Sequence, residues 1–109
     1  MPALRFTHRF IEHSVTLFTE AERLALIDFV SANPDTGDIV AGTGGVRKLR
    51  WGMAGQGKRG GARALYIFLR HKDALWFLDV YAKRDKSDLS PNDVTHLRAV
   101  VEAIKRAPG

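Results

Sequence analysis

The residues with the clearest chemical potential in this sequence are basic side chains gathered in one stretch. Residues 39–72 contain eight Lys and Arg side chains and no Asp or Glu, and eight of the ten glycines of the chain lie in the same stretch. Further cations follow a short way downstream. The cations singled out are Arg47, Lys48, Arg50, Lys58, Arg59, Arg63, Arg70, Lys83, Arg84 and Lys86.

An uncompensated run of cations among glycines indicates a surface for a polyanion. Arginine stays protonated and binds phosphate through bidentate contacts, and glycine lets the backbone approach a ligand closely. A solvated loop with chance charge is the alternative, but surfaces that only keep a protein soluble usually mix both signs. The net charge of +5 therefore comes from one basic segment, which we expect to bind a polyanion such as nucleic acid.

Two nucleotide-binding patterns occur in the glycine-rich stretch by accident. Residues 55–60 match GxGxxG, and Gly52 to Lys58 match the beginning of a P-loop. Glycines in these motifs deliver phosphate to the start of a following helix, whereas a strand is expected here. Arg59 also stands where a P-loop has the Ser or Thr that holds magnesium. We expect no nucleotide cofactor.

Metal binding and the common hydrolytic sites are not indicated either. The chain has no cysteine, and its histidines, at positions 8, 13, 71 and 96, have no metal-ligand spacing. A lone histidine is more often a surface or packing residue than a ligand. No GxSxG elbow supports a serine hydrolase. We expect neither a metal nor a cofactor.

The length of 109 residues predicts one domain, 1–109, with a modest core. No apolar run approaches the roughly 18 residues that a membrane span needs, and the first residues lack the apolar stretch of a signal peptide. A cytoplasmic protein without membrane contact is the simplest expectation.

The N-terminal third predicts a strand and then a helix. Residues 4–10 alternate apolar and polar side chains, which is the period of a half-buried strand. Thr19 and Glu22 have the spacing of a capping box. Leu24, Ile27 and Val30 follow at helical spacing, and Asn33-Pro34 ends the pattern.

The remainder predicts three strands and a C-terminal helix. Residues 46–51, 63–70 and 74–81 are strand candidates, and the last two are close enough to pair as a hairpin. Ser90 and Pro91 suit the start of a helix. The expected fold is α+β, with a small curved antiparallel sheet and helices packed on one face. The other face is left for a ligand.

The alternation of side chains along residues 46–51 predicts on which face of this strand each cation lies. Lys48 and Arg50 share one side of this strand, and Arg47, Leu49 and Trp51 share the other. Since Leu49 and Trp51 favour the core, Lys48 and Arg50 are expected to be exposed. Arg63 opens the next strand and Lys83-Arg84 closes the third, so these cations can converge if the strands are neighbours.

These residues, in this order, resemble the RelE/HigB superfamily of toxins from bacterial type II toxin–antitoxin modules, and most closely its HigB-like branch. The resemblance covers about residues 33–106, and its motifs are specific in combination. They are Asn33-Pro34, Gly37-Asp38, GTGGVRKLRW (42–51), GQGKRGGARALYIFL (55–69) and VYAKRDKSDLS (80–90).

The resemblance implies a RelE-like toxin fold and a ribosome-dependent mRNA endoribonuclease that cleaves mRNA in the ribosomal A site and stops translation. It also implies a cognate antitoxin that is HigA-like and contains a helix-turn-helix. The toxin would contact DNA only indirectly, through this antitoxin. By matched position its functional residues are Lys48, Arg50, Arg63 and Arg84. Of these, we assign catalysis to Lys48, Arg63 and Arg84. The residues assigned to RNA binding are Arg47, Arg50, Lys58, Arg59, Lys83 and Lys86.

The general base is left open by the sequence. Some RelE-type members have a tyrosine shortly after the final arginine, where this chain reads Ser87-Asp88-Leu89-Ser90. Arg63 and Arg84 suit the stabilisation of a phosphorane. A lysine crowded by cations loses its proton more easily, so Lys48 or Lys58 is the candidate base. Without a strong acid–base pair, we expect poor cleavage of free RNA and dependence on the ribosome for positioning.

The sequence is also compatible with two alternatives to an active nuclease. A non-catalytic module that binds RNA or the ribosome explains the charge equally well, although such modules usually expose aromatic side chains for base stacking. A family member without nuclease activity that keeps antitoxin binding is the second. Replacement of Arg63 by alanine separates a binding module from an enzyme, because only an enzyme loses nearly all turnover.

Overall fold

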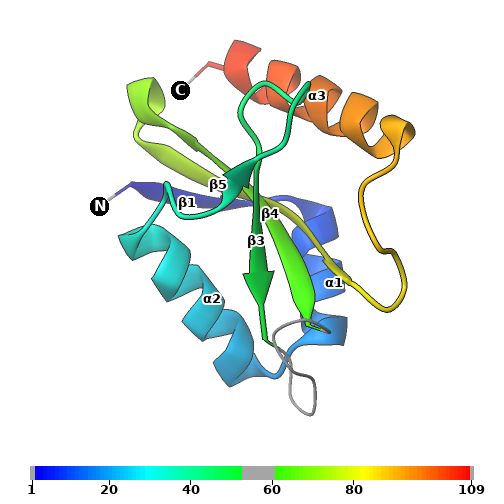
Figure 1. Ribbon diagram of the computed structural model, residues 1–109. Coiled ribbons are helices and arrows are strands. Elements are labelled where there is room, and N and C mark those ends of the chain that lie inside the picture. Colours follow the sequence, from blue (N-terminus) through cyan, green and yellow to red (C-terminus); the bar gives the residue numbers. More distant parts are fainter. Residues whose placement is uncertain (1, 53–60, 109) are drawn as a thin grey trace.

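The computed structural model describes residues 2–52 and 61–108, which form one sheet with helices on both of its faces (Figure 1). A short 3-10 turn, Arg70–Lys72, joins the two longest strands. The elements in chain order are β1 (Ala3–Phe6), α1 (His8–Leu17), α2 (Glu20–Ala32), β2 (Asp38–Ile39), β3 (Arg47–Trp51), β4 (Ala62–Leu69), β5 (Ala74–Ala82) and α3 (Pro91–Arg106).

The α+β class is confirmed, and the sheet is mixed rather than purely antiparallel. Its strand order is β1-β5-β4-β3-β2. The β2–β3, β3–β4 and β4–β5 pairs are antiparallel, while β1 runs parallel to β5. A parallel neighbour requires a long crossover, and the chain from α1 to β4 supplies it. The expectation of an antiparallel sheet is therefore wrong for the pairing of β1 and holds for the other strands.

Helices α1 and α2 cover one face of the sheet. Phe10 and Phe18 of the α1 segment and Leu26 and Val30 of α2 are buried against alternate residues of β4 and β5. Those strand residues include Ala64, Tyr66, Leu75 and Phe77. Burial of these apolar side chains is the main stabilising term of this layer.

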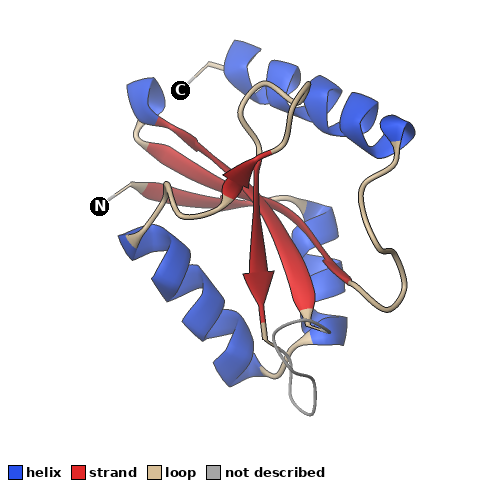
Figure 2. Ribbon diagram, viewed as in Figure 1, coloured by secondary structure: helices blue, strands red, loops and turns tan. Residues whose placement is uncertain are grey.

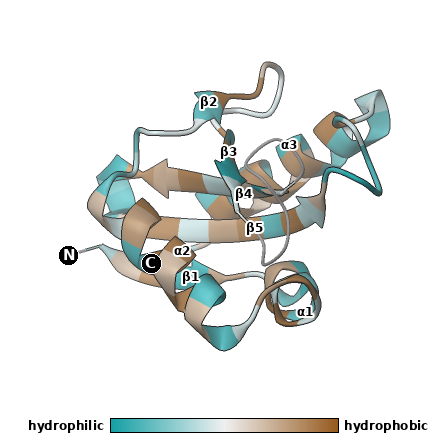
Figure 3. Ribbon diagram, turned by 60° about the horizontal axis from the view of Figure 1, so that its bottom comes forward, coloured by the Kyte–Doolittle hydropathy of each residue, from teal (hydrophilic) through white to brown (hydrophobic). Residues whose placement is uncertain are grey.

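Helix α3 covers part of the opposite face, so the prediction that helices pack on one face only is wrong. Leu97 and Val101 of α3 are buried against Leu65, Ile67 and Leu78. Figures 2 and 3 show α3 across the sheet from α1 and α2. Both faces of β4 are therefore apolar along most of its length. The end of this face near the start of β4 is not covered by α3 and holds the cations described below.

The predicted strand over residues 4–10 ends early, because a helix begins at His8. Thr7 is the N-cap of α1, and its hydroxyl accepts a hydrogen bond of 3.1 Å from the Phe10 amide. Phe10 and Ser14, four residues apart, form the buried side of the helix. The Thr7 cap was the signal in the sequence for this helix.

The other predicted elements are confirmed. Thr19 and Glu22 form the capping box of α2, which ends one residue before Asn33. Strands β4 and β5 pair as the expected hairpin. Ser90 is the N-cap of α3 and Pro91 is its first residue. The two-residue strand β2, which pairs with the start of β3, was not predicted.

Candidate functional site

The pairing of β3 with β4 forms the floor of the site. Arg50 lies directly opposite Arg63, and Lys48 lies opposite Leu65. Directly opposed residues of antiparallel strands project from the same face, so the three cations share the α3 side of the sheet. Leu49 and Trp51 pack against the core on the other side. The predicted division of this strand is confirmed.

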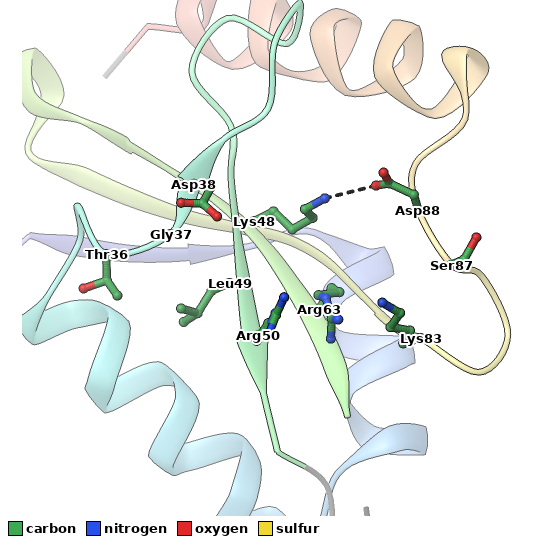
Figure 4. A pocket seen from close by; sticks show the side chains of 10 residues that line it. All are labelled: Thr36, Gly37, Asp38, Lys48, Leu49, Arg50, Arg63, Lys83, Ser87 and Asp88. Atoms are coloured by element: carbon green, nitrogen blue, oxygen red, sulfur yellow. Dashed lines mark hydrogen bonds and ion pairs between the residues drawn. The ribbon is translucent and has the colours of Figure 1, made fainter. Parts of the chain in front are cut away.

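A cavity of about 430 Å³ opens over this floor. We call it the cationic pocket. Figure 4 shows its cations directed into one space from β3, β4 and the chain that follows β5. Its lining residues are Thr36, Gly37, Asp38, Lys48, Leu49, Arg50, Arg63, Lys83, Ser87 and Asp88.

Arg63 is the buried cation of the pocket. It is only 6% exposed, and it donates one hydrogen bond, of 3.2 Å, to the carbonyl oxygen of Ala62. Within the described residues it forms no ion pair with a carboxylate. A buried charge is costly unless an opposite charge compensates it. The Arg63 guanidinium is thus a buried positive charge that no carboxylate of the described residues compensates.

Tyr81 lies opposite Arg63 on the β5 side. Its hydroxyl is buried and has no hydrogen-bond partner among the described residues. Burial raises the pKa of this phenol, as does the nearby Asp88 carboxylate, while Arg63 opposes them. The phenol is therefore neutral at physiological pH and does not compensate the charge of Arg63.

Lys48 reaches a carboxylate from a distant part of the chain. Its Nζ lies 3.0 Å from Oδ1 of Asp88, in the connection between β5 and α3. The hydrogen bond from Lys48 lowers the pKa of Asp88, and a second one, from the Leu89 amide, adds to this. Asp88 is therefore ionised at neutral pH. The sequence offered no signal for this contact, since it depends on how the connection folds.

The segment before β2 forms one wall by close approach to the sheet. A Cβ atom at Gly37 would lie 3.0 Å from the Lys48 carbonyl oxygen and 3.0 Å from the Tyr66 hydroxyl. The Gly37 amide donates a hydrogen bond of 2.8 Å to that hydroxyl. Glycine is required here because a side chain would push this wall away from β3.

The structure does not bring all of the predicted site residues together. Arg47 points away from the pocket, where it donates to the carbonyls of Asp35 and Gly37. Arg84 is exposed and does not line the cavity; its nearest charge partner is Asp85, at 3.9 Å. Lys83 does line it.

Lys86 does not line the cationic pocket either. Its ammonium pairs with Asp93 at 3.1 Å and lies 5.3 Å from the centre of the Tyr81 ring. Lys58 and Arg59 lie outside the described residues. Lys48, Arg50, Arg63 and Lys83 are therefore the predicted residues that converge, and Asp88 and Asp38 are the acidic residues that the prediction missed.

Over residues 2–52 and 61–108 there is no group of three or more His, Cys, Asp or Glu arranged to hold a metal ion. In the same part of the chain, none of the helices has the length and apolar character needed to cross a membrane.

The folds of three solved structures are similar to this one. A double mutant of E. coli RelE in the free state matches with a TM-score of 0.59 and 15% identity, over 92% of this chain and 96% of that one. The isolated E. coli RelE toxin matches with a TM-score of 0.55 and 16% identity, over 97% and 98%. The intact E. coli RelBE toxin–antitoxin complex contains a match with a TM-score of 0.54 and 15% identity, over 73% and 94%. At these identities the likeness shows the fold alone.

The sequence itself matches a family model, described as the RelE toxin of the RelE/RelB toxin–antitoxin system, over residues 19–107. The match includes every described residue that lines the cationic pocket. It extends over most of the 109 residues. This chain therefore belongs to the RelE family of toxins of toxin–antitoxin systems.

Proposed function

We propose that this toxin is a ribosome-dependent endoribonuclease that cleaves mRNA in the ribosomal A site and thereby inhibits translation. The observation that carries the proposal is Arg63, a buried guanidinium that lines an open cavity without a carboxylate ion pair in the described residues. A phosphodiester placed there would supply the missing negative charge. Arg50 and Lys83 line the same cavity and would hold the flanking phosphates.

The pocket suits cleavage by the internal 2′-hydroxyl of RNA. The 2′-oxygen attacks the adjacent phosphorus and loses its proton, a phosphorane with additional negative charge forms, and the bond to the 5′-oxygen breaks as that oxygen gains a proton. The products are a 2′,3′-cyclic phosphate and a 5′-hydroxyl. Arg50 and Arg63, opposed across β3 and β4, would stabilise the charge of the phosphorane.

Lys48 is the candidate for proton transfer. Its Nζ donates to Asp88, and an ammonium in this position can protonate the leaving 5′-oxygen. Cationic crowding suggests general base as the alternative role of Lys48. In that role Lys48 would first have to lose the proton of its ammonium group. Phosphate can compete with the exposed Asp88 carboxylate for Lys48. Arg84 keeps its assigned role only if the connection after β5 moves toward the RNA.

Dependence on the ribosome follows from what the pocket contains. The described residues that line it include no histidine, and their two carboxylates, Asp38 and Asp88, lie among four cations. Strong proton-transfer groups can accelerate a reaction by about 10²–10⁴-fold, and a site without them relies on precise positioning of the reacting groups. The ribosome would supply that positioning by fixing the mRNA codon.

The proposal includes a partner of a defined kind. The family consists of toxins paired with antitoxins, and we place this chain in the HigB-like branch on the motifs of residues 42–51 and 80–90. The cognate antitoxin would then be HigA-like with a helix-turn-helix, and contact of the toxin with DNA would be indirect. A small helix-turn-helix protein encoded next to this chain would support this assignment.

The experiment that tests the proposal compares one mRNA in two states. Purified toxin is incubated with ribosomes programmed with a defined mRNA and, separately, with the same mRNA alone, and new 5′-ends are mapped by primer extension. Cleavage within the A-site codon on ribosomes, with slow cleavage of the free RNA, is expected. Equal rates on free and ribosomal RNA would contradict ribosome dependence, and no cleavage in either state would contradict the nuclease assignment.

A further inference from the structure

A second cavity adjoins the cationic pocket at the edge of the sheet. It has a volume of about 500 Å³ and lies between helix α2 and the end of β3. We call it the aromatic groove. Its lining residues are Glu22, Ala25, Phe29, Leu49, Arg50, Trp51 and Gly52. Most of this lining is apolar, in contrast to that of the cationic pocket.

The two cavities meet around an open strand edge. Strand β2 pairs only with Arg47 and Lys48, so within the described residues the outer edge of β3 from Leu49 to Trp51 has no neighbouring strand. Leu49 and Arg50 line both cavities. Figure 4 shows Leu49 directed toward α2 and Arg50 directed toward Arg63. A ligand that passes around this edge can therefore occupy both cavities at once.

The aromatic wall of the groove is held in place before any ligand arrives. The indole Nε1 of Trp51 donates a hydrogen bond of 3.2 Å to the carbonyl oxygen of Glu22. The Phe29 ring lies 5.5 Å from that of Trp51, with 42° between their planes. Phe29 is 38% exposed and lines the groove. Among the described residues, no atom lies within 4 Å of the place that a Cβ of Gly52 would take.

We propose that the aromatic groove binds an unpaired nucleobase of the RNA whose phosphate occupies the cationic pocket. The inference rests on the proposed function in taking RNA as the ligand. Proteins that bind single-stranded RNA combine a cationic track for the backbone with aromatic side chains on which bases stack. Here Arg50 joins the two parts. The groove then contributes affinity and base preference, while the chemistry stays in the cationic pocket.

The charge of the surroundings favours RNA over an apolar protein segment as the occupant. The groove opens beside Arg50 and the other cations of the pocket, and the carboxylate of Glu22 accepts a hydrogen bond of 2.8 Å from the Thr19 amide in the helix cap. A nucleotide offers both an anionic group and a flat apolar surface, and so matches both cavities.

The test uses Trp51 as its own reporter. The chain has two tryptophans, and Trp76→Phe leaves Trp51 as the sole one. This variant is titrated with a short 2′-O-methyl oligoadenylate, which cannot be cleaved, and with an abasic oligomer of equal length and charge. We expect the adenylate to quench Trp51 fluorescence and the abasic oligomer not to do so.

Three further substitutions in that background measure the contribution of the groove. Phe29→Ala should weaken binding of the adenylate by about 5- to 160-fold, the range of one base stack, and leave the abasic oligomer unaffected. Ala25→Leu, which fills the groove and keeps the ring pair, should act in the same direction. Leu24→Ala is the matched control, since Leu24 is 49% exposed on the same helix and lines a different cavity. Thermal unfolding establishes that the variants are folded.

The outcomes separate this inference from the proposed function. Equal affinity for the two oligomers, or no effect of Phe29→Ala and Ala25→Leu, overturns the nucleobase site and leaves the nuclease assignment standing. Quenching of Trp51 by the antitoxin but not by the adenylate overturns it in favour of a protein-binding surface. Base-dependent quenching by a toxin that does not cleave on ribosomes contradicts the proposed function and supports the groove.

Discussion

Arg50 and Arg63 lie directly opposite each other on β3 and β4, with their side chains on one face of the sheet. Like charges in this position destabilise a pair of strands. Arg63 is also buried, and within the described residues its side chain donates one hydrogen bond, to the Ala62 carbonyl. The free protein therefore holds a repulsive arrangement that a bound phosphodiester would relieve, as is common where a site serves function at the expense of stability.

Replacing Arg50 by threonine should change stability and binding in opposite directions. The variant removes the repulsion and introduces a residue that favours strands, so the free energy of unfolding should rise by about 0.2–1 kcal/mol. Affinity for single-stranded RNA should fall, and the slope of log affinity against log salt should decrease by about 0.7. Urea unfolding and oligonucleotide titration at several salt concentrations measure the two effects. A less stable variant with unchanged RNA affinity would show that this pair is structural.

The ion pair of Lys48 with Asp88 predicts two different phenotypes. Lys48→Met removes the candidate proton-transfer group and should abolish most cleavage on programmed ribosomes. Asp88→Asn removes only the competing carboxylate, so RNA affinity should be retained or increase. Cleavage and RNA binding are measured for both variants. Full cleavage by Lys48→Met would refute its catalytic role, and weaker RNA binding by Asp88→Asn would show that Asp88 does not compete with RNA.

The cap of α3 predicts a pH dependence of stability. The hydrogen bond from the Ser90 amide, with help from Lys86, lowers the pKa of Asp93 from its usual 3.8. A carboxyl group with a depressed folded-state pKa stabilises the fold above its unfolded pKa and loses that effect as the pH falls through the lower, folded value. Asp93→Asn should thus be less stable than the natural chain at pH 7, with the difference shrinking as the pH falls below 3.8 and the Asp93 carboxyl becomes protonated.

Ser90→Ala is the comparison variant for the Asp93→Asn experiment. Its hydroxyl accepts a hydrogen bond of 3.1 Å from the Asp93 amide, and loss of such a cap costs about 1 kcal/mol. Because a hydroxyl does not titrate in this range, the loss of stability caused by Ser90→Ala should persist to lower pH than the loss caused by Asp93→Asn. Urea unfolding at each pH measures both variants. An Asp93→Asn deficit that persists unchanged at low pH would contradict the assigned cause.

Local patterns predicted the elements whose signals lie within a few residues. The capping boxes at Thr19 and Ser90 marked the starts of α2 and α3, and alternation along β3 separated Lys48 and Arg50 from Leu49 and Trp51. The start of α1 was misread because residues 4–10 also fit a strand, although Thr7 caps a helix.

Relations between distant segments were not accessible in the same way. The parallel pairing of β1 with β5, the contact of Asp88 with Lys48 and the groove between Phe29 and Trp51 all join residues far apart in the chain. Each depends on how the layers pack, which periodicity does not report. Phe29 is 38% exposed and lines the aromatic groove together with Trp51, while Trp51 also packs against the core, as alternation along β3 predicted.

The most direct test of the central claim is turnover by Arg63→Ala on ribosomes programmed with a defined mRNA. Arg98→Ala is the matched control, because Arg98 is an exposed arginine of α3 whose guanidinium donates to the Gly42 carbonyl, away from the cationic pocket. We predict that Arg63→Ala lowers the cleavage rate by about 10²–10³-fold, as expected for the loss of a preorganised charge-stabilising group, while Arg98→Ala cleaves like the natural chain. A folded Arg63→Ala variant that binds RNA less tightly but cleaves at an undiminished rate when saturated would contradict the account.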